Sequence, residues 1–62
     1  MRCRLCYDED GFPSVRVFET GDDDSARRRA FGIAGGGSAV KDLEEVDELN
    51  MKIRDIPATT AA

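Results

Sequence analysis

The last third of the sequence constrains the fold most, because its apolar residues recur with the period of an α-helix. On a helical wheel they fall within about 140° of one another. These residues are Leu43, Val46, Leu49, Ile53 and Ile56. Pro57 would end such a helix, since the residue before a proline is disfavoured in the helical conformation. We therefore expect one long amphipathic helix over residues 39–56.

The charges in this segment favour the same helix. Ser38 is a suitable N-cap residue. Asp42 lies near the expected beginning and Arg54 near the expected end, as the helix dipole prefers. We expect the apolar stripe to pack on its own chain or in a partner's groove, and its five residues are the candidate interface.

The first half of the chain contains strand and turn signals. The β-branched and aromatic residues of SVRVFE favour a short strand over residues 14–19. CRLCY can pair with it as a hairpin arm, because Gly11 and Pro13 in the sequence DEDGFP are typical of a turn. The run at residues 35–38 is Gly-Gly-Gly-Ser, which is typical of a flexible linker and lacks the Lys-Ser/Thr ending of a phosphate-binding loop.

The predicted fold class is therefore small α+β. It consists of an N-terminal hairpin or knuckle-like segment (1–34), a glycine-rich hinge (35–38), the long helix (39–56) and a frayed tail (57–62). Sixty-two residues support only a small core. Apolar residues make up 40% and charged residues 35% of the chain, a composition near the border between marginal folds and segments that order on binding. Partial disorder is the alternative.

Charge and hydropathy exclude several functional classes. The net charge of −4 would repel a nucleic-acid backbone, so we expect no direct nucleic-acid binding. No apolar run approaches the 18 residues of a membrane span. The sequence MRCRLCYDED lacks the apolar region of a signal peptide, which predicts an intracellular location with reduced thiols.

The two cysteines, Cys3 and Cys6, carry the clearest chemical signal. Their Cys-x-x-Cys spacing allows both thiolates to bind one zinc ion from a tight turn, and Arg4 between them would offset the thiolate charge. The chain holds no other cysteine and no histidine, so the remaining ligands would come from elsewhere. A redox pair is disfavoured, because the acids that follow would raise the thiol pKa. Two ordinary buried thiols are the third alternative.

Three consecutive arginines, Arg27, Arg28 and Arg29, follow three aspartates. The plain interpretation is a solvated charge cluster that neutralises itself. The alternative is a contact with a phosphate or an acidic partner, which guanidinium groups suit. The carboxylates lie in solvated runs and no serine has a nearby base, so we expect neither an enzyme nor a small-molecule substrate.

The stretch CRLCYDEDGFPSVRVFE resembles the opening of the zinc-finger-associated domain of insect zinc-finger transcription factors. The matching residues are Cys3, Arg4, Leu5 and Cys6, followed by Val17, Phe18 and Glu19. The resemblance implies a treble-clef unit that holds zinc through Cys3 and Cys6, forms homodimers, and acts in the nucleus in transcription regulation. The second cysteine pair of that family is absent from this sequence.

The function expected from these observations is a protein–protein interaction module that self-associates and resembles part of a zinc-binding dimerisation domain. The alternative is a marginally folded or disordered small protein whose C-terminal helix binds a partner's groove without a metal.

Overall fold

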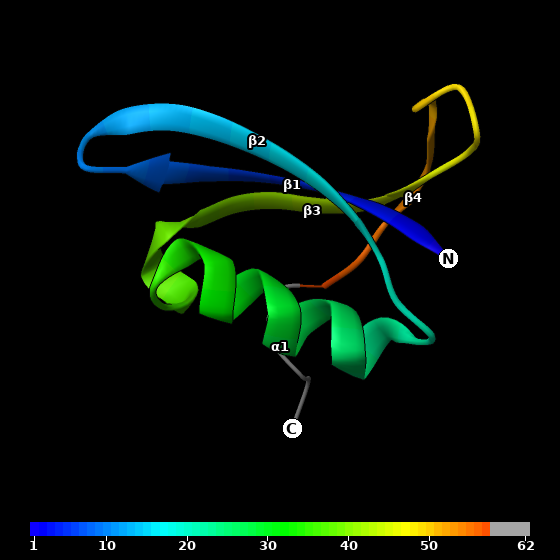
Figure 1. Cartoon of the computed structure of the whole chain (residues 1–62), viewed down its shortest axis with the longest axis horizontal. Helices are drawn as coiled ribbons and strands as arrows, with labels where there is room; N and C mark the ends of the chain where they lie inside the picture. The colour runs from blue at the N-terminus through cyan, green and yellow to red at the C-terminus, as the bar shows by residue number, and fades with distance from the viewer. Residues whose placement is uncertain (58–62) are drawn as a thin grey trace.

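The computed structural model describes residues 1–57 and shows a four-stranded antiparallel sheet with one helix on one of its faces (Figure 1). The elements are β1 (Arg2–Glu9), β2 (Phe12–Glu19), α1 (Asp23–Ala34), the 3₁₀ turn η1 (Gly37–Ala39), β3 (Val40–Val46) and β4 (Lys52–Asp55). Their order across the sheet is β2-β1-β3-β4, so the first strand lies in its interior.

Strand β1 builds the centre of the molecule by strict alternation of its side chains. Cys3, Leu5 and Tyr7 are buried on the face that α1 covers. Arg4 and Cys6 lie on the opposite face, because successive side chains of a strand point to opposite sides. One face of β1 therefore belongs to the core, and the other is open to charged neighbours.

A two-residue turn joins β1 to β2. Asp10 and Gly11 both have positive φ angles, 51° and 83°, and Glu9 pairs directly with Phe12. Two consecutive positive φ angles are the mark of the hairpin turn whose twist matches the flanking strands, and Asp-Gly is a preferred sequence for it. The turn sets a register that continues through all eight residue pairs to Arg2 and Glu19.

Both ends of α1 are capped. The Asp22 carboxylate accepts the backbone N–H of Ser25 at 2.8 Å, which satisfies one of the free donors at the helix N-terminus. At the other end Gly35 has φ 81°, and the carbonyl of Phe31 accepts the N–H groups of Gly35 and Gly36. This left-handed cap is the usual reason for a glycine just after a helix.

The core lies between α1 and the sheet. The helix contributes Ala26 and Ala30, both fully buried, and their small side chains allow its backbone to approach the strands closely. The core residues are Cys3, Leu5, Tyr7, Phe18, Ala26, Ala30, Leu43 and Ile56.

The loop between β3 and β4 has its own set of hydrogen bonds. The Asp47 carboxylate accepts the N–H groups of Leu49 at 2.8 Å and Met51 at 3.0 Å, and Asn50 has a positive φ of 61°. Aspartate and asparagine favour such turns because their side chains bond nearby backbone groups. Figure 1 shows this loop on the side of the sheet away from α1.

Two arginines of β1 hold the loop against that open face. Arg4 donates to the carbonyl of Asn50 at 2.9 Å, and Arg2 donates to the carbonyl of Glu48 at 3.1 Å. Arg4 also pairs with the Glu44 carboxylate at 2.9 Å, which is nearly buried in β3. A buried carboxylate with an arginine partner avoids the cost of an unpaired charge.

The prediction of one long helix over residues 39–56 is wrong. These residues form β3, the loop and β4, and the helix of the fold is α1 at Asp23–Ala34. The apolar spacing fits a helical wheel. However, the backbone of β3 forms hydrogen bonds with the edge of β1 that does not face β2, so residues 40–46 form a strand instead of a helix. Asp47 and Asn50 then reverse the chain. The alternative based on an isolated C-terminal helix is overturned with it.

The glycine-rich residues 35–38, expected as a hinge, follow α1 directly. Gly35 caps the helix, and the chain passes through η1 into β3, which pairs with β1. Residues before and after this segment therefore share one sheet. Of the expected frayed tail, 57–62, only Pro57 lies within the described residues.

Candidate functional site

Within residues 1–57 the sheet has two outer strands, and they differ sharply. β4 has four residues, KIRD, of which all but one carry a charge. β2 has eight residues and exposes three large apolar side chains, Phe12, Val15 and Val17. Proteins usually keep outer strands short and charged, because an exposed row of backbone groups can pair with another chain. β4 follows that rule, whereas β2 departs from it.

The hydrogen-bond phase of the β1–β2 ladder can be read at its end. The N–H of Thr20 donates to the Met1 carbonyl at 2.9 Å, and the Met1 amino nitrogen donates to the Thr20 carbonyl at 2.5 Å. In an antiparallel ladder such doubly bonded pairs recur at every second residue. Phe18, Arg16 and Ser14 of β2 therefore direct their backbone groups inward, toward β1.

The remaining residues of β2 direct their backbone groups outward. Val15, Val17 and Glu19 present an N–H and a C=O to the outer edge, and Pro13 presents only a C=O. A proline in this position costs the sheet nothing, because its missing N–H would face away from β1. Among the described residues nothing pairs with this edge. It is a ready template for another strand.

The side chains of Val15 and Val17 accompany this edge on the open face of the sheet. They pair with Cys6 and Arg4 of β1 and keep 64% and 42% of their surface exposed. β-branched residues pack well against a neighbouring strand on a pleated surface. The outer edge thus combines unpaired backbone groups with two apolar side chains of the preferred type.

The helix leaves the edge uncovered. α1 packs on β1 and β3, and in Figure 1 it runs beneath the interior of the sheet. Phe18 is the buried residue of β2, and the Arg29 guanidinium lies 5.4 Å from the centre of its ring. This distance is typical of a cation–π contact. It closes the core beside β2 without blocking the outer backbone groups.

The three predicted anion-binding arginines do not form one cluster on α1. Arg27 pairs with Asp24 one turn earlier, Arg28 is exposed, and Arg29 lies over Phe18. Consecutive helical residues are separated by about 100° around the axis, so the three side chains diverge. An anion contact by the three together stays a prediction that this arrangement does not favour.

The two cysteines lie on opposite faces of β1. Cys3 is fully buried under α1, and Cys6 is partly exposed on the open face. Burial raises the pKa of the Cys3 thiol, which disfavours the thiolate that metals bind. Their opposite directions do not fit a zinc site shared by both, and residues 1–57 contain no group of three or more metal-binding side chains. Zinc binding stays a prediction from the resemblance.

The five predicted interface residues do not share a face. Leu43 and Ile56 are buried beneath α1, and Val46 is buried as well. Leu49 and Ile53 are exposed, by 81% and 56%. The structure thus brings two of the five into the core and leaves two on the surface.

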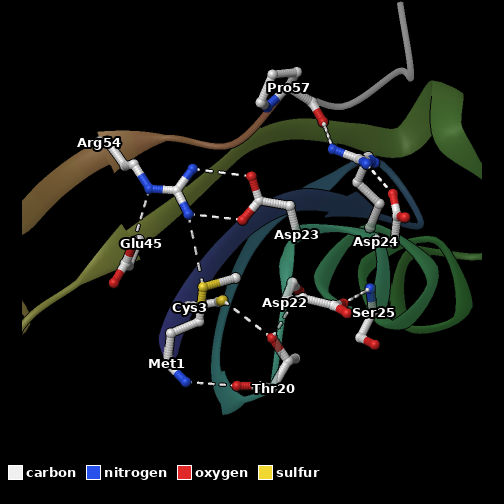
Figure 2. A network of polar contacts seen from close by, with 11 residues as sticks. Met1, Cys3, Thr20, Asp22, Asp23, Asp24, Ser25, Glu45, Arg54 and Pro57 are labelled. Atoms are coloured by element: carbon white, nitrogen blue, oxygen red, sulfur yellow. Dashed lines mark hydrogen bonds and ion pairs between the residues drawn. The ribbon is translucent and has the colours of Figure 1, made fainter.

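Arg54 of β4, at the edge of the sheet opposite β2, forms hydrogen bonds that connect β4 with β3 and α1, as Figure 2 shows. Its guanidinium donates to both carboxylate oxygens of Asp23, at 3.0 and 2.7 Å, and to Glu45 of β3 at 2.8 Å. The hydrogen bonds from Arg54 hold the pKa of Asp23 below its usual range, and Asp23 in turn raises that of Arg54. This network fixes the short outer strand β4 to the N-terminus of α1.

A shallow hollow lies where Arg2 and Val46 approach each other, and its rim is largely acidic. Glu19 and Glu45 on this rim already pair with Arg2 and Arg54. Among the described residues, every buried side-chain nitrogen or oxygen has a hydrogen-bond partner. The hollow therefore contains no buried polar group that would need a ligand as its partner. The outer edge of β2 remains the strongest candidate site.

The sequence predicts the strand at residues 14–19 but does not by itself place this strand at the outer edge of the sheet. The available signal was Pro13, because a proline inside a strand indicates an outer position. The exposed alternation of Val15 and Val17 around Arg16 was the second signal.

A comparison of the chain with models of protein families, with curated proteins and with solved structures finds no match. No helix in the described part of the chain is long and apolar enough to span a membrane.

Proposed function

We propose that this protein is an interaction module that binds another protein by strand addition at the outer edge of β2. The observation that carries the proposal is the outward row of backbone groups at Val15, Val17 and Glu19, with two exposed valines beside it. In strand addition the backbone bonds supply affinity, and alternate side chains supply specificity.

The edge is well prepared for binding. β2 pairs with β1 through eight consecutive residues without a bulge, so its outer groups lie in one regular row. β1 in turn is fixed by β3 and by the core. A strand that needs no reorganisation loses less entropy when it binds.

The expected energies support a specific but moderate interaction. Each backbone hydrogen bond contributes about 0.5–1.5 kcal/mol net. Further covering of Val15 and Val17 adds about 25 cal/mol for each Å² of apolar surface removed from water. Several such bonds exceed the contribution of any exposed ion pair on this surface, which is typically below about 1 kcal/mol.

The test is selection of ten-residue peptides from a random phage-displayed library against the full chain. We expect the selected peptides to slow amide hydrogen exchange at Val15, Val17 and Glu19 when they bind. Val17→Pro removes one outward N–H while leaving the inward ladder intact, and it should weaken peptide binding at least about tenfold.

The matched control is Val17→Thr, which keeps the N–H and the β-branched shape and should bind the peptides with similar affinity. Far-ultraviolet circular dichroism checks that both variants fold. Equal binding by the proline variant, or protection of amides away from β2, would show that this edge is not the binding site.

A further inference from the structure

The outer edge of β2 points to a particular partner. We infer that the added strand is β2 of a second copy of this chain, antiparallel to the first, with Val17 on the two-fold axis. The inference rests on the proposed function, because it names the partner of the same edge. It follows from the positions of the outward backbone groups and of the charges on β2.

A symmetric antiparallel pair of strands has few allowed registers. The same edge must face itself, and outward residues of one copy must oppose outward residues of the other. At least two of Val15, Val17 and Glu19 oppose outward residues of the partner's β2 only when the axis passes through Val15, Arg16, Val17 or Phe18. Each choice pairs a different set of outward groups, and these sets can be compared.

Two of the four registers conflict with residues of the strand. With the axis at Val15, Pro13 opposes Val17 of the other copy and cannot supply the N–H that the ladder needs. With the axis at Arg16, the two Arg16 side chains lie directly opposite each other, and like charges in that position are destabilising.

The other two registers differ in how many outward residues of β2 they pair. With the axis at Phe18, Val15 opposes Gly21, which lies beyond the end of β2. With the axis at Val17, the two Val17 residues oppose each other and Val15 opposes Glu19 on both sides. Every outward N–H and C=O of these three residues is then paired.

The Val17 register also matches apolar and charged side chains. The exposed valines of both copies gather in one patch, because Val17 lies next to its counterpart and diagonal to Val15 of the other copy. On the helix-facing side Arg16 opposes Phe18, so the two Arg16 side chains do not lie directly opposite each other. Residues 12–19 carry one arginine and one glutamate, so the strand itself has no net charge, although the whole chain carries −4.

The rest of the fold permits this dimer. A two-fold axis perpendicular to the sheet keeps both helices on one face, and each α1 packs over β1 and β3 rather than over β2. The result is one continuous sheet with four strands from each chain. Two strand edges bury less area than a standard protein interface, so the dimer should be concentration-dependent.

The test begins with sedimentation of the full chain at about 5 μM to 1 mM. We expect a monomer–dimer equilibrium that Val17→Pro shifts toward monomer at least about tenfold and that Val17→Thr retains. A dimer that Val17→Pro leaves unchanged would place self-association on another surface and overturn the inference.

Disulfide trapping fixes the register independently of any folding defect in the proline variant. In a Cys6→Ser background, Val17→Cys should cross-link to itself under mild oxidation, since doubly bonded partners have Cα atoms about 5.5 Å apart. Val15→Cys should cross-link to Glu19→Cys in a mixture but not to itself. Self-linking of Val15→Cys instead would refute the Val17 register.

The inference and the proposed function fail in different ways. A chain that stays monomeric at 1 mM, while library peptides still protect the amides of Val15 and Val17, would overturn only the second-copy partner. Absence of protection by peptides and by increasing protein concentration would overturn both.

Discussion

Arg54 of β4 and Asp23 of α1 are joined by two parallel hydrogen bonds, although 31 residues separate them along the chain. Asp23→Asn keeps the size of the side chain but removes its charge and one strong acceptor. We expect its urea-unfolding midpoint at pH 7 to lie below that of the unmodified chain. Arg54→Lys should lower it too, because lysine cannot form the two-pronged contact. Overlapping unfolding curves would show that the network is dispensable.

The same pair predicts a pH dependence. The folded pKa of Asp23 is lowered by the Arg54 hydrogen bonds, and that of Asp22 by the Ser25 N–H at the helix cap. A lowered folded pKa gives stability that is fully present above the unfolded value, about 3.9, and is lost as the pH falls through the folded value. The urea concentration at the unfolding midpoint should therefore decrease as the pH is lowered below about 4. The difference in this midpoint between Asp23→Asn and the unmodified chain should become smaller over the same pH range.

Leu43 and Leu49 provide a matched test of the fold itself. Leu43 is 3% exposed in the core, and Leu49 is 81% exposed in the loop. Leu43→Ala should lower the free energy of unfolding by about 2–5 kcal/mol, and Leu49→Ala should change it by less than about 0.5 kcal/mol. Chemical denaturation measures both. Equal losses would instead support a continuous apolar helical stripe.

Two glycines near the end of α1 should respond in opposite directions to alanine. Gly35 has φ 81°, so Gly35→Ala should cost about 1 kcal/mol through backbone strain alone, since an added Cβ meets no atom within 4 Å. Gly32 lies inside the helix with equally open space, so Gly32→Ala should stabilise by about 0.5–1 kcal/mol. Thermal unfolding of the two variants distinguishes the signs, and a shared sign would contradict this end for the helix.

The two thiols should react at very different rates. Cys3 is buried with a raised pKa, whereas Cys6 is partly exposed. A maleimide reagent at pH 7.5 should therefore label Cys6 first, and Cys3 only when the chain unfolds. Peptide mass spectrometry identifies the labelled residue. Equal labelling of both thiols in the folded chain would contradict their placement on opposite faces of β1.

The sequence predicts the local features of this protein better than it predicts which strands pair with each other. The Asp10-Gly11 turn and the strand at residues 14–19 depend on nearby residues, and both lie in the region expected for them. Residues 43–56 carry a helical spacing that is consistent with their own charges. Their strand structure depends on β1, whose partner lies far away in the sequence.

The candidate site was only partly visible for the same reason. Val17 can be assigned to a strand from its neighbours, but its position at an outer edge depends on the order of all four strands. Cys3 and Cys6 resemble a metal-binding pair when read as a turn. Because they occupy a strand, the same spacing places them on opposite faces.

The interior position of β1 has a consequence for the order of folding. The β1–β2 hairpin, α1 and the β3–β4 hairpin can each begin from near neighbours, but Leu5 meets Leu43 only when a long loop closes. Such closure costs about 3 kcal/mol in chain entropy, more than one backbone hydrogen bond returns. A two-stranded hairpin is marginal by itself in water. The β1–β3 contact is therefore the step on which the folding rate should depend, and until it forms both edges of the first hairpin are open to other chains.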